Sequence, residues 1–370
     1  MRTTQRDRRA FPEFGFYAQP GHVFDAPRVL DDTRTGEALG LGSLWISERL
    51  GAKDAPVLSG AAAAVSDRIH IGSGLIANLP LRHPLAVASY GATMSLLSGG
   101  RFVLGIGRGQ PALAKATHTP NLTFEILESY VAALRALWRG EAVSGTAGGW
   151  QMDGVSLGME LADPPPIIMG VEGDKTAQWA GRVCDGVMIQ GLWNVEGTAH
   201  TARLVRAGAE AAGRDPAEVE ILAALITACE VSEEEMLQTI IRRWNTYMHY
   251  PVFLDNVCRI NGWDRKRMED IRERVNAISL RRRPASSGPW GDENVSRELG
   301  DLIEARDLYP TEWLHAAFAV GDRRHCAQAV RDRMDAGCDG IIFHGTTPAN
   351  LKPLIEAWPD FRPTREHVHV

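Results

Sequence analysis

Short apolar runs alternate with longer amphipathic stretches along most of this chain. The apolar runs cover residues 14–18, 43–46, 68–76, 102–106, 167–169, 185–189, 219–230 and 338–343. Because several of them are continuously apolar, they are typical of strands buried on both faces of a sheet. The stretches between them have the spacing of helices, so the pattern predicts eight consecutive β/α units.

Eight β/α units predict a (β/α)8 TIM barrel with insertions, formed as one domain by residues 1–370. A doubly wound sheet needs only about five or six strands and leaves the other runs unassigned. No segment has the composition of a linker between two domains. We expect residues 1–12 to form a flexible tail and residues 232–310 to form a helical insertion after the seventh strand.

The predicted insertion leaves the barrel at the carboxyl end of a strand, where substrates bind in TIM barrels. It carries several aromatic side chains among its charges, which argues against disorder. They include Trp244, Tyr247, Phe253 and Trp263. We therefore predict a helical lid whose aromatic side chains form one wall of the substrate pocket, with a dimerisation arm as the alternative.

The composition excludes several classes of protein. The 370 residues are 44% hydrophobic and 23% charged, as in soluble globular proteins. A net charge of −6 argues against a nucleic-acid surface, and no apolar run approaches the ~20 residues that cross a bilayer. Five cysteines without a CxxC pair fit reduced thiols in the cytoplasm. No pair of histidines has the spacing of a metal site, so we expect no metal.

Five motifs occur in register with the predicted strands. They are Leu-Trp-Ile-Ser-Glu-Arg at 44–49, Arg-His-Pro at 82–84, Gly-Gly-Arg-Phe at 99–102, Gly-Ile-Gly-Arg-Gly at 105–109 and Ala-Gly-Arg-Val-Cys-Asp-Gly-Val at 180–187. With these motifs in this order, residues 14–230 and 321–357 resemble the bacterial luciferase-like family. Members of that family use flavin mononucleotide (FMN) or the deazaflavin coenzyme F420. Residues 235–315 have no counterpart in the family pattern.

The resemblance implies a cofactor site at the carboxyl ends of the barrel strands. The family has a non-prolyl cis peptide in the bulge of the third strand, against the central ring of the cofactor. Counting back from His83 places that bond at Leu75–Ile76, with Gly74–Leu75 as the alternative register. The implied cofactor-binding residues are Leu75, Ile76, Asn78, Arg108, Gly170, Val171, Glu172, Gly173, Thr176 and Gln190.

The loop at 170–176 has a physical reason to bind the cofactor phosphate. It is a glycine-containing loop that enters a helix, where unpaired N–H groups and the helix dipole favour an anion. Its acidic residues Glu172 and Asp174 repel a phosphate, so we expect Lys175 to offset them.

Glu48, Arg49 and His344 are the catalytic candidates. The family commonly has an acidic residue followed by histidine where this chain has Glu48 and Arg49. An arginine stays protonated and does not act as a general base near neutral pH, so Arg49 would stabilise an enolate or bind a substrate carboxylate. Alternatively, Glu48 and Arg49 form only an ion pair at the rim. His344 ends the eighth strand as a candidate proton donor, and Tyr17, Gln19 and His22 follow the first strand at the same end.

The resemblance implies an F420-dependent oxidoreductase that transfers a hydride between the deazaflavin and an unidentified small organic substrate. F420 is favoured because Arg49 replaces a residue typical of the oxygen-using branch, and because segments 105–109 and 180–187 look like those of deazaflavin members. The alternatives are an FMN-dependent monooxygenase partnered by a flavin reductase, and a cofactor-free relative that acts as a binding protein. A homodimer is also expected.

Overall fold

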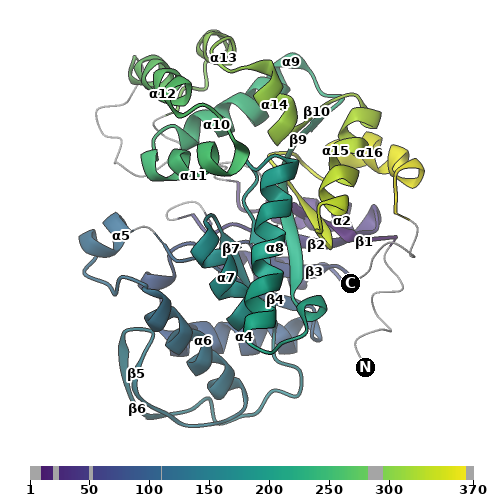
Figure 1. Ribbon diagram of the computed structural model, residues 1–370. Coiled ribbons are helices and arrows are strands. Elements are labelled where there is room, and N and C mark those ends of the chain that lie inside the picture. The colour runs from purple at the N-terminus through teal and green to yellow at the C-terminus, as the bar shows by residue number, and fades with distance from the viewer. Residues whose placement is uncertain (1–9, 20–24, 50–52, 110, 282–294, 364–370) are drawn as a thin grey trace.

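The computed structural model describes residues 10–19, 25–49, 53–109, 111–281 and 295–363 (Figure 1). Eight parallel strands form a closed barrel in chain order, because the last of them pairs with the first. They are β1 (Phe11–Tyr17), β2 (Leu41–Ile46), β3 (His70–Ser73), β4 (Phe102–Ile106), β7 (Ile167–Val171), β8 (Gly186–Ile189), β9 (Glu220–Cys229) and β11 (Gly340–His344). The predicted TIM barrel is confirmed.

Helices surround the barrel and follow its strands. They are α2 (Arg28–Ala38), α3 (Ala55–Ala63), α4 (Pro84–Ser98), α6 (Phe124–Trp138), α7 (Asp174–Val183), α8 (Val195–Ala211), α15 (Arg323–Asp335) and α16 (Lys352–Ala357). The sequence fixes the ends of α4 clearly. His83 Nδ1 accepts the N–H of Leu85, Pro84 occupies the first turn, and Gly99 ends the helix with a φ of 62°.

The interior of the barrel is filled by side chains and is not a channel. Tyr17, Trp45, Ile168, Met188 and Leu222 belong to one buried cluster that draws on strands around the barrel. Close packing against Trp45 explains a glycine in β3, since a Cβ on Gly72 would lie 2.3 Å from the indole ring. A larger apolar cluster lies between the strands and the helices.

Three segments differ from the expectations. β1 begins at Phe11, so residues 11–12 belong to a strand and not to the expected tail, whose residues 1–9 lie outside the described part. The third strand ends its regular pairing at Ser73, well before the predicted residue 76. The irregular stretch after residue 140 contains a hairpin of β5 (Val143–Ala147) and β6 (Trp150–Val155) that the pattern did not predict.

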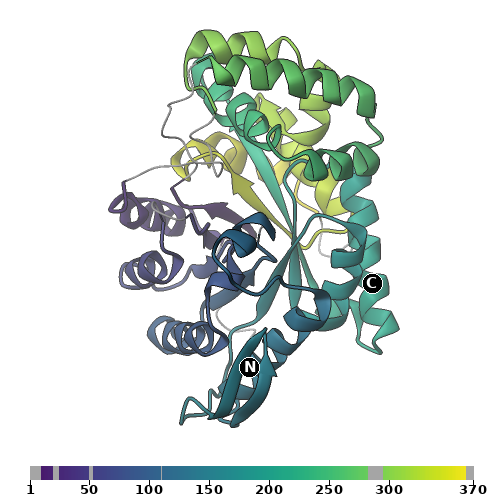
Figure 2. The same ribbon diagram turned by 90° about the vertical axis from the view of Figure 1, so that its left-hand side faces the viewer.

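Helices of the segment after β9 lie over the carboxyl ends of the strands, and the β5–β6 hairpin lies at the opposite end of the molecule (Figures 1 and 2). They are α9 (Glu233–Met236), a π-helix (Leu237–Ile241), α10 (Arg242–Tyr247), α11 (Pro251–Asn261), α12 (Arg265–Leu280), α13 (Leu299–Arg306) and α14 (Thr311–Ala317). We call this segment the insertion. Its helices extend to Ala317, past the expected boundary at 310, and the short β10 (Ala319–Gly321) then pairs with β9.

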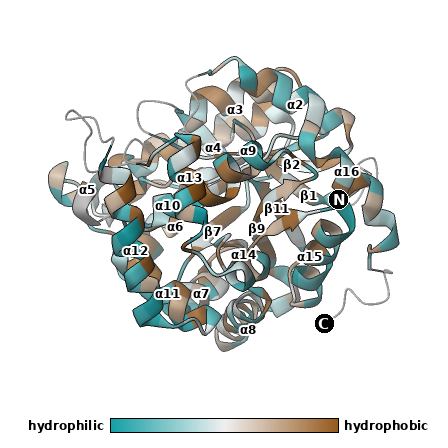
Figure 3. Cartoon of the chain, turned by 90° about the horizontal axis from the view of Figure 1, so that it is seen from above, coloured by the Kyte–Doolittle hydropathy of each residue, from teal (hydrophilic) through white to brown (hydrophobic). Residues whose placement is uncertain are grey.

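The aromatic side chains of the insertion divide into two groups. Trp244 stacks on Tyr309 at 4.4 Å between ring centroids, and Trp263 stacks on Trp313 at 4.7 Å. These rings form the core of the insertion itself. Tyr247 instead reaches a residue of the barrel. Phe253 stacks on Tyr247 at 4.6 Å and on Trp193, between β8 and α8, at 5.8 Å. The predicted wall of aromatic side chains is therefore in part an internal core, and Tyr247 and Phe253 are the members that contact the barrel. Seen from above, α10 and α13 lie near the strand ends (Figure 3).

Candidate functional site

The carboxyl ends of four strands bring Tyr17, Arg49, Gln190 and His344 to one end of the barrel, which we call the mouth. Tyr17 ends β1 and His344 ends β11, and their rings meet edge to face at 4.6 Å. The Tyr17 hydroxyl donates to Met188 Sδ at 2.9 Å. Burial raises the pKa of the Tyr17 phenol well above its usual value, although Arg49 and Arg243 act to lower it. Tyr17 is therefore a protonated donor at neutral pH.

A chain of hydrogen bonds connects the insertion to the barrel. Arg243 Nη2 donates to the Tyr247 hydroxyl at 2.8 Å, and the guanidinium carbon lies 4.9 Å from the centre of the same ring. The Tyr247 hydroxyl donates to Gln190 Oε1 at 3.4 Å, and Gln190 Nε2 donates to Glu172 Oε1 at 3.4 Å. The Gly191 N–H also donates to Gln190 Oε1, at 2.7 Å, which fixes the orientation of the amide.

Glu172 lies on the far side of that chain, in the loop after β7. Loss of hydration raises the pKa of its carboxyl, while the Gln190 amide and the nearby Arg108 lower it. Glu172 is therefore hydrogen-bonded to the Gln190 amide, and the positive charge of Arg108 partly offsets its negative charge.

The N-terminus of α7 has the features of an anion site. Its N-cap residue, Gly173, offers no side-chain hydrogen bond, so the N–H groups of the first turn remain open to a ligand. Both carboxylate oxygens of Asp174 are bound elsewhere: Arg259 donates to them at 2.9 and 3.2 Å, and His200 Nε2 lies 3.2 Å from Oδ1. These partners hold the pKa of Asp174 below its usual value. Arg259 of the insertion therefore offsets the acidic charge for which we had expected Lys175 to be needed.

Arg108 lies on the same side, after β4. Its side chain is exposed, its guanidinium carbon lies 4.6 Å from the centre of the Phe124 ring, and it donates to the carbonyl oxygen of Leu122 at 3.2 and 3.3 Å. Close approach explains a glycine nearby, because a Cβ on Gly170 would lie 2.2 Å from Leu75 Cδ1. Arg108 is also within electrostatic reach of Glu172, in the loop that leads into α7.

The segment after β3 corrects one expectation. The non-prolyl cis peptide is at Gly74–Leu75, the alternative register, and not at Leu75–Ile76. Ile76 is fully buried and forms a bridge with Ile106, so its side chain belongs to the core. Leu75 and Asn78 are half-buried. The Asn78 backbone N–H donates to the Glu48 carboxylate.

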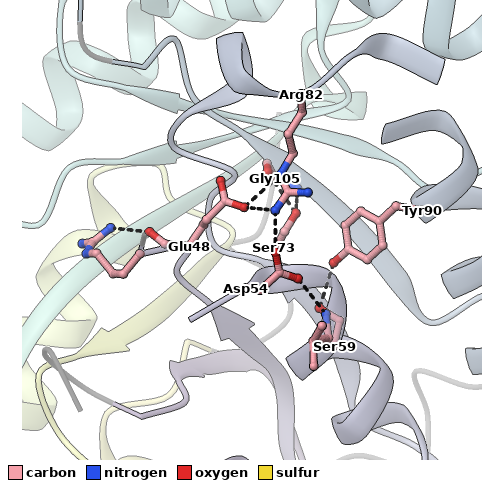
Figure 4. A network of polar contacts seen from close by, with 9 residues as sticks. Glu48, Asp54, Ser59, Ser73, Arg82, Tyr90 and Gly105 are labelled. Carbon is pink, nitrogen blue, oxygen red and sulfur yellow. Dashed lines mark hydrogen bonds and ion pairs between the residues drawn. The ribbon is translucent and has the colours of Figure 1, made fainter. Parts of the chain in front are cut away.

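Glu48 is the centre of a buried polar network (Figure 4). Its side chain is almost fully enclosed, and Arg82 donates to Oε1 through Nε at 2.9 Å and through Nη2. The same Nη2 donates to Asp54 at 2.9 Å. Arg49 donates to the backbone oxygen of Glu48 at 2.9 Å. The Glu48 carboxylate forms its ion pair with Arg82, and not with Arg49 as the alternative had it. Burial raises the pKa of Glu48 although Arg82 acts to lower it.

Comparison with known proteins identifies the family. The model of the luciferase-like monooxygenase family matches residues 11–340. The chain belongs to the luciferase-like monooxygenase family. The resemblance of its five motifs to this family is therefore confirmed, although the match also extends across the insertion.

Two curated relatives of this luciferase-like protein are oxidoreductases, and the name of the second includes F420. It is 29% identical over 200 residues to a 5,10-methylenetetrahydromethanopterin reductase from Methanolobus tindarius, covering 53% of this chain and 60% of the relative. It is 30% identical over 209 residues to an F420-dependent hydroxymycolic acid dehydrogenase from Mycobacterium tuberculosis, covering 52% and 56%. The matches thus span less than two thirds of the length of these curated relatives.

A solved structure supports the fold over the whole barrel. The coenzyme F420-dependent tetrahydromethanopterin reductase from Methanopyrus kandleri superposes with a TM-score of 0.73 at 19% identity, covering 95% of this chain and 100% of the other. At that identity the likeness shows the luciferase-like fold alone.

The sequence-predicted site residues fall into separate places in this luciferase-like barrel. Arg49, Gln190 and His344 gather at the mouth, and Arg108, Glu172, Gly173 and Thr176 lie around the start of α7. Glu48 and the Ile76 side chain are enclosed in the protein. His22 lies outside the described residues. Within the described ranges, no group of three or more His, Cys, Asp or Glu could hold a metal ion, and no helix could cross a membrane.

Three residues near the mouth and the start of α7 were not predicted as site residues. Arg243 and Arg259 had no predicted role, and Tyr247 was expected only as one of several aromatic residues in the pocket wall. Arg243, Tyr247 and Arg259 come from the insertion, for which the motifs gave no counterpart. The only signal in the sequence is the spacing of Arg243 and Tyr247, four residues apart and so on one face of a helix.

Proposed function

We propose that this protein is an F420-dependent oxidoreductase that transfers a hydride between the deazaflavin and a small organic substrate. The observation that supports it most is the N-terminus of α7, which has no side-chain cap, combined with a relative that is named F420-dependent. An uncapped helix N-terminus beside an exposed arginine suits the phosphate of such a cofactor. When bound, F420 would supply the site that accepts or donates the hydride.

The residues of this chain fit the cofactor on one side of the mouth. The N–H groups of Gly173 and Thr176 and the guanidinium of Arg108 would hold the phosphate. Gly170 and Val171 would give the backbone room to approach it. Leu75, Asn78 and the backbone at Ile76 would line the ring, and Glu172 and Gln190 would contact its polar edge. Asp174 does not oppose binding, because Arg259 and His200 already hold its carboxylate.

The opposite side of the mouth would hold the substrate. Tyr17 keeps its proton at neutral pH and contacts His344, so these two side chains are the candidates to hold or move a proton at the substrate oxygen. Glu48 does not reach the mouth itself, because its enclosed carboxylate accepts hydrogen bonds from Arg82 and from the backbone N–H of Asn78. We propose Glu48 as a positioning residue and Arg49 and His344 as the residues that contact substrate.

Equilibrium titration of the purified protein against F420 and against FMN tests the proposal. F420 fluorescence should change on binding, with one site per chain, and Arg108→Ala should weaken that binding by about 1.5–3 kcal/mol, the contribution of a charge-assisted hydrogen bond. FMN should bind more weakly. Tighter binding of FMN would favour the monooxygenase alternative, and binding of neither cofactor would favour a cofactor-free binding protein.

We also propose a homodimer formed through α3 and α4. Val57, Leu96 and Leu97 on these helices are 68%, 64% and 56% exposed. A groove of about 430 Å³ lies between the two helices and is lined in part by Leu97. A second copy of the chain would cover these three exposed apolar side chains. Light scattering should give a dimer mass, and a monomer mass at every concentration would refute this.

A further inference from the structure

Two arginines from distant parts of the chain lie at the mouth. Arg49 follows β2, and Arg243 lies on α10 of the insertion. Both act electrostatically on the Tyr17 phenol, at the end of β1. Tyr17 donates a hydrogen bond to Met188 on β8. Gln190, two residues after Met188, accepts a hydrogen bond from the Tyr247 hydroxyl. Arg243 is bonded to that same hydroxyl, so the contacts place Arg243 over the same strand ends as Tyr17.

The backbone that carries each arginine is fixed. Arg49 and Lys53 exchange backbone hydrogen bonds of 3.0 and 2.9 Å, which holds the backbone of Arg49 in place. Arg243 follows a π-helix, a feature often found at functional sites. The Thr239 hydroxyl of this π-helix donates to the carbonyl oxygen of Gly345 at 3.3 Å, directly after His344. The insertion therefore starts in a defined position above β11.

Two acidic groups near the mouth, both among the described residues, have other partners. Glu172 is bonded to Gln190 and lies near Arg108 on the cofactor side. Glu48 is enclosed and paired with Arg82. The half of the mouth around Tyr17 thus combines two guanidinium groups with a phenol and an imidazole. Guanidinium groups recognise planar or tetrahedral oxyanions through paired N–H donors.

We propose that the substrate carries an oxyanion, a carboxylate or a phosphate, which binds between Arg49 and Arg243 beside Tyr17. This inference rests on the proposed oxidoreductase function, because it assigns the remaining half of the mouth to the substrate. The α7 N-terminus and Arg108 form a separate anion site, on the other side of the Gln190–Tyr247 contact. The protein therefore has two places for negative charge, one for the cofactor and one for the substrate.

Calorimetric titration of the F420-loaded full chain with inorganic phosphate, and separately with acetate, tests this assignment. Loading with F420 fills the site at α7, so any remaining anion binding reports the second site. The variants are Arg49→Gln and Arg243→Gln, which remove one charge each. The matched control is Arg274→Gln on α12, an arginine that is 61% exposed and far along the insertion.

We expect the loaded protein to bind one anion per chain, and each mouth variant to weaken that binding at least tenfold while Arg274→Gln leaves it unchanged. Tighter binding of phosphate than acetate assigns a phosphorylated substrate, and the reverse assigns a carboxylate. Anion binding that disappears when F420 is loaded, or that both mouth variants retain, overturns the inference. A wild-type chain that binds no F420 instead contradicts the proposed function, and the same anion titrations on the unloaded protein then still test Arg49 and Arg243.

Discussion

On the side of β4 and β7, the mouth of the barrel is formed by glycines and by the N–H groups that begin α7, whereas on the side of β1, β2 and β11 it is formed by Tyr17, Arg49 and His344. The first side uses mainly backbone groups, which suit a cofactor that is the same in many proteins. The second side uses charged and aromatic side chains, partly supplied by the insertion. Under the proposed function, the barrel would bind the cofactor, and the insertion together with a few strand ends would select the substrate.

The largest expected effect concerns Arg82, which lies under the boundary between the two sides. Arg82→Met leaves the enclosed Glu48 carboxylate without its partner, so we expect a loss of about 3 kcal/mol in the free energy of unfolding at neutral pH. Urea unfolding measures this loss. Adding Glu48→Gln to the variant should recover most of it, because the two residues interact directly.

The same variant has a predicted pH dependence. Burial raises the pKa of Glu48 in the folded state above its unfolded value, and loss of Arg82 raises that pKa further. The folded state then holds the proton more tightly, so its stability falls as the pH rises through the folded pKa. The deficit of Arg82→Met should be smaller at about pH 5 than at about pH 8. An equal deficit at both would show that the lost charge pair is not its cause.

A second prediction concerns F420 binding on the side of β4 and β7. Gly170→Val places a side chain where Leu75 lies, since even a Cβ would meet Leu75 Cδ1 at 2.2 Å. We expect the displaced Leu75 side chain to weaken F420 binding about tenfold, and the overpacking to lower the free energy of unfolding by about 1–3 kcal/mol. Fluorescence titration checks it, with Gly300→Ala on α13 as a control, where a Cβ has open space. Unchanged F420 affinity in Gly170→Val would remove this loop from the cofactor site.

A third prediction separates the two sides from each other. Tyr247→Phe removes the hydroxyl that joins Arg243 to Gln190, a loss of about 1 kcal/mol for one hydrogen bond. We expect F420 affinity to stay close to the wild-type value and anion binding at the mouth to weaken by severalfold. The reverse pattern in the two titrations would place Tyr247 on the cofactor side.

The smallest expected effect concerns the contact between the insertion and α7. Arg259→Gln leaves Asp174 less well offset at the phosphate site, so F420 should bind roughly threefold more weakly, in keeping with the modest strength of exposed ion pairs. The difference should shrink in high salt, because exposed charges are screened. A salt-independent loss would point to a structural change in α11.

The fold was largely predictable because buried parallel strands are continuously apolar, as in β4 and β8. The β5–β6 hairpin was missed because its strands are mostly exposed and carry glycines in place of an alternating pattern, for instance Gly145 and Gly154 with positive φ. The third strand was predicted too long because Leu75 and Ile76 continue its apolar run, while the backbone leaves the regular pairing after Ser73.

The candidate site was predictable only where a local motif carries it. Gly170 to Thr176 could be found because a loop entering a helix is visible in a short stretch of sequence. Arg243 and Tyr247 could not be placed, since nothing local shows that α10 lies above β8 and β11. For the same reason the ion pair of Asp174 with Arg259 could not be predicted, because the two residues are 85 positions apart in the sequence.

A crystal structure of the protein grown with F420 tests the two-sided site most directly. The cofactor phosphate should contact the N–H groups at Gly173–Thr176 and the guanidinium of Arg108, and the ring should lie beside Leu75 and Asn78. The cofactor should leave Arg49, Arg243 and Tyr17 uncovered. A phosphate bound between Arg49 and Arg243, or a cofactor that leaves the start of α7 empty, would contradict it.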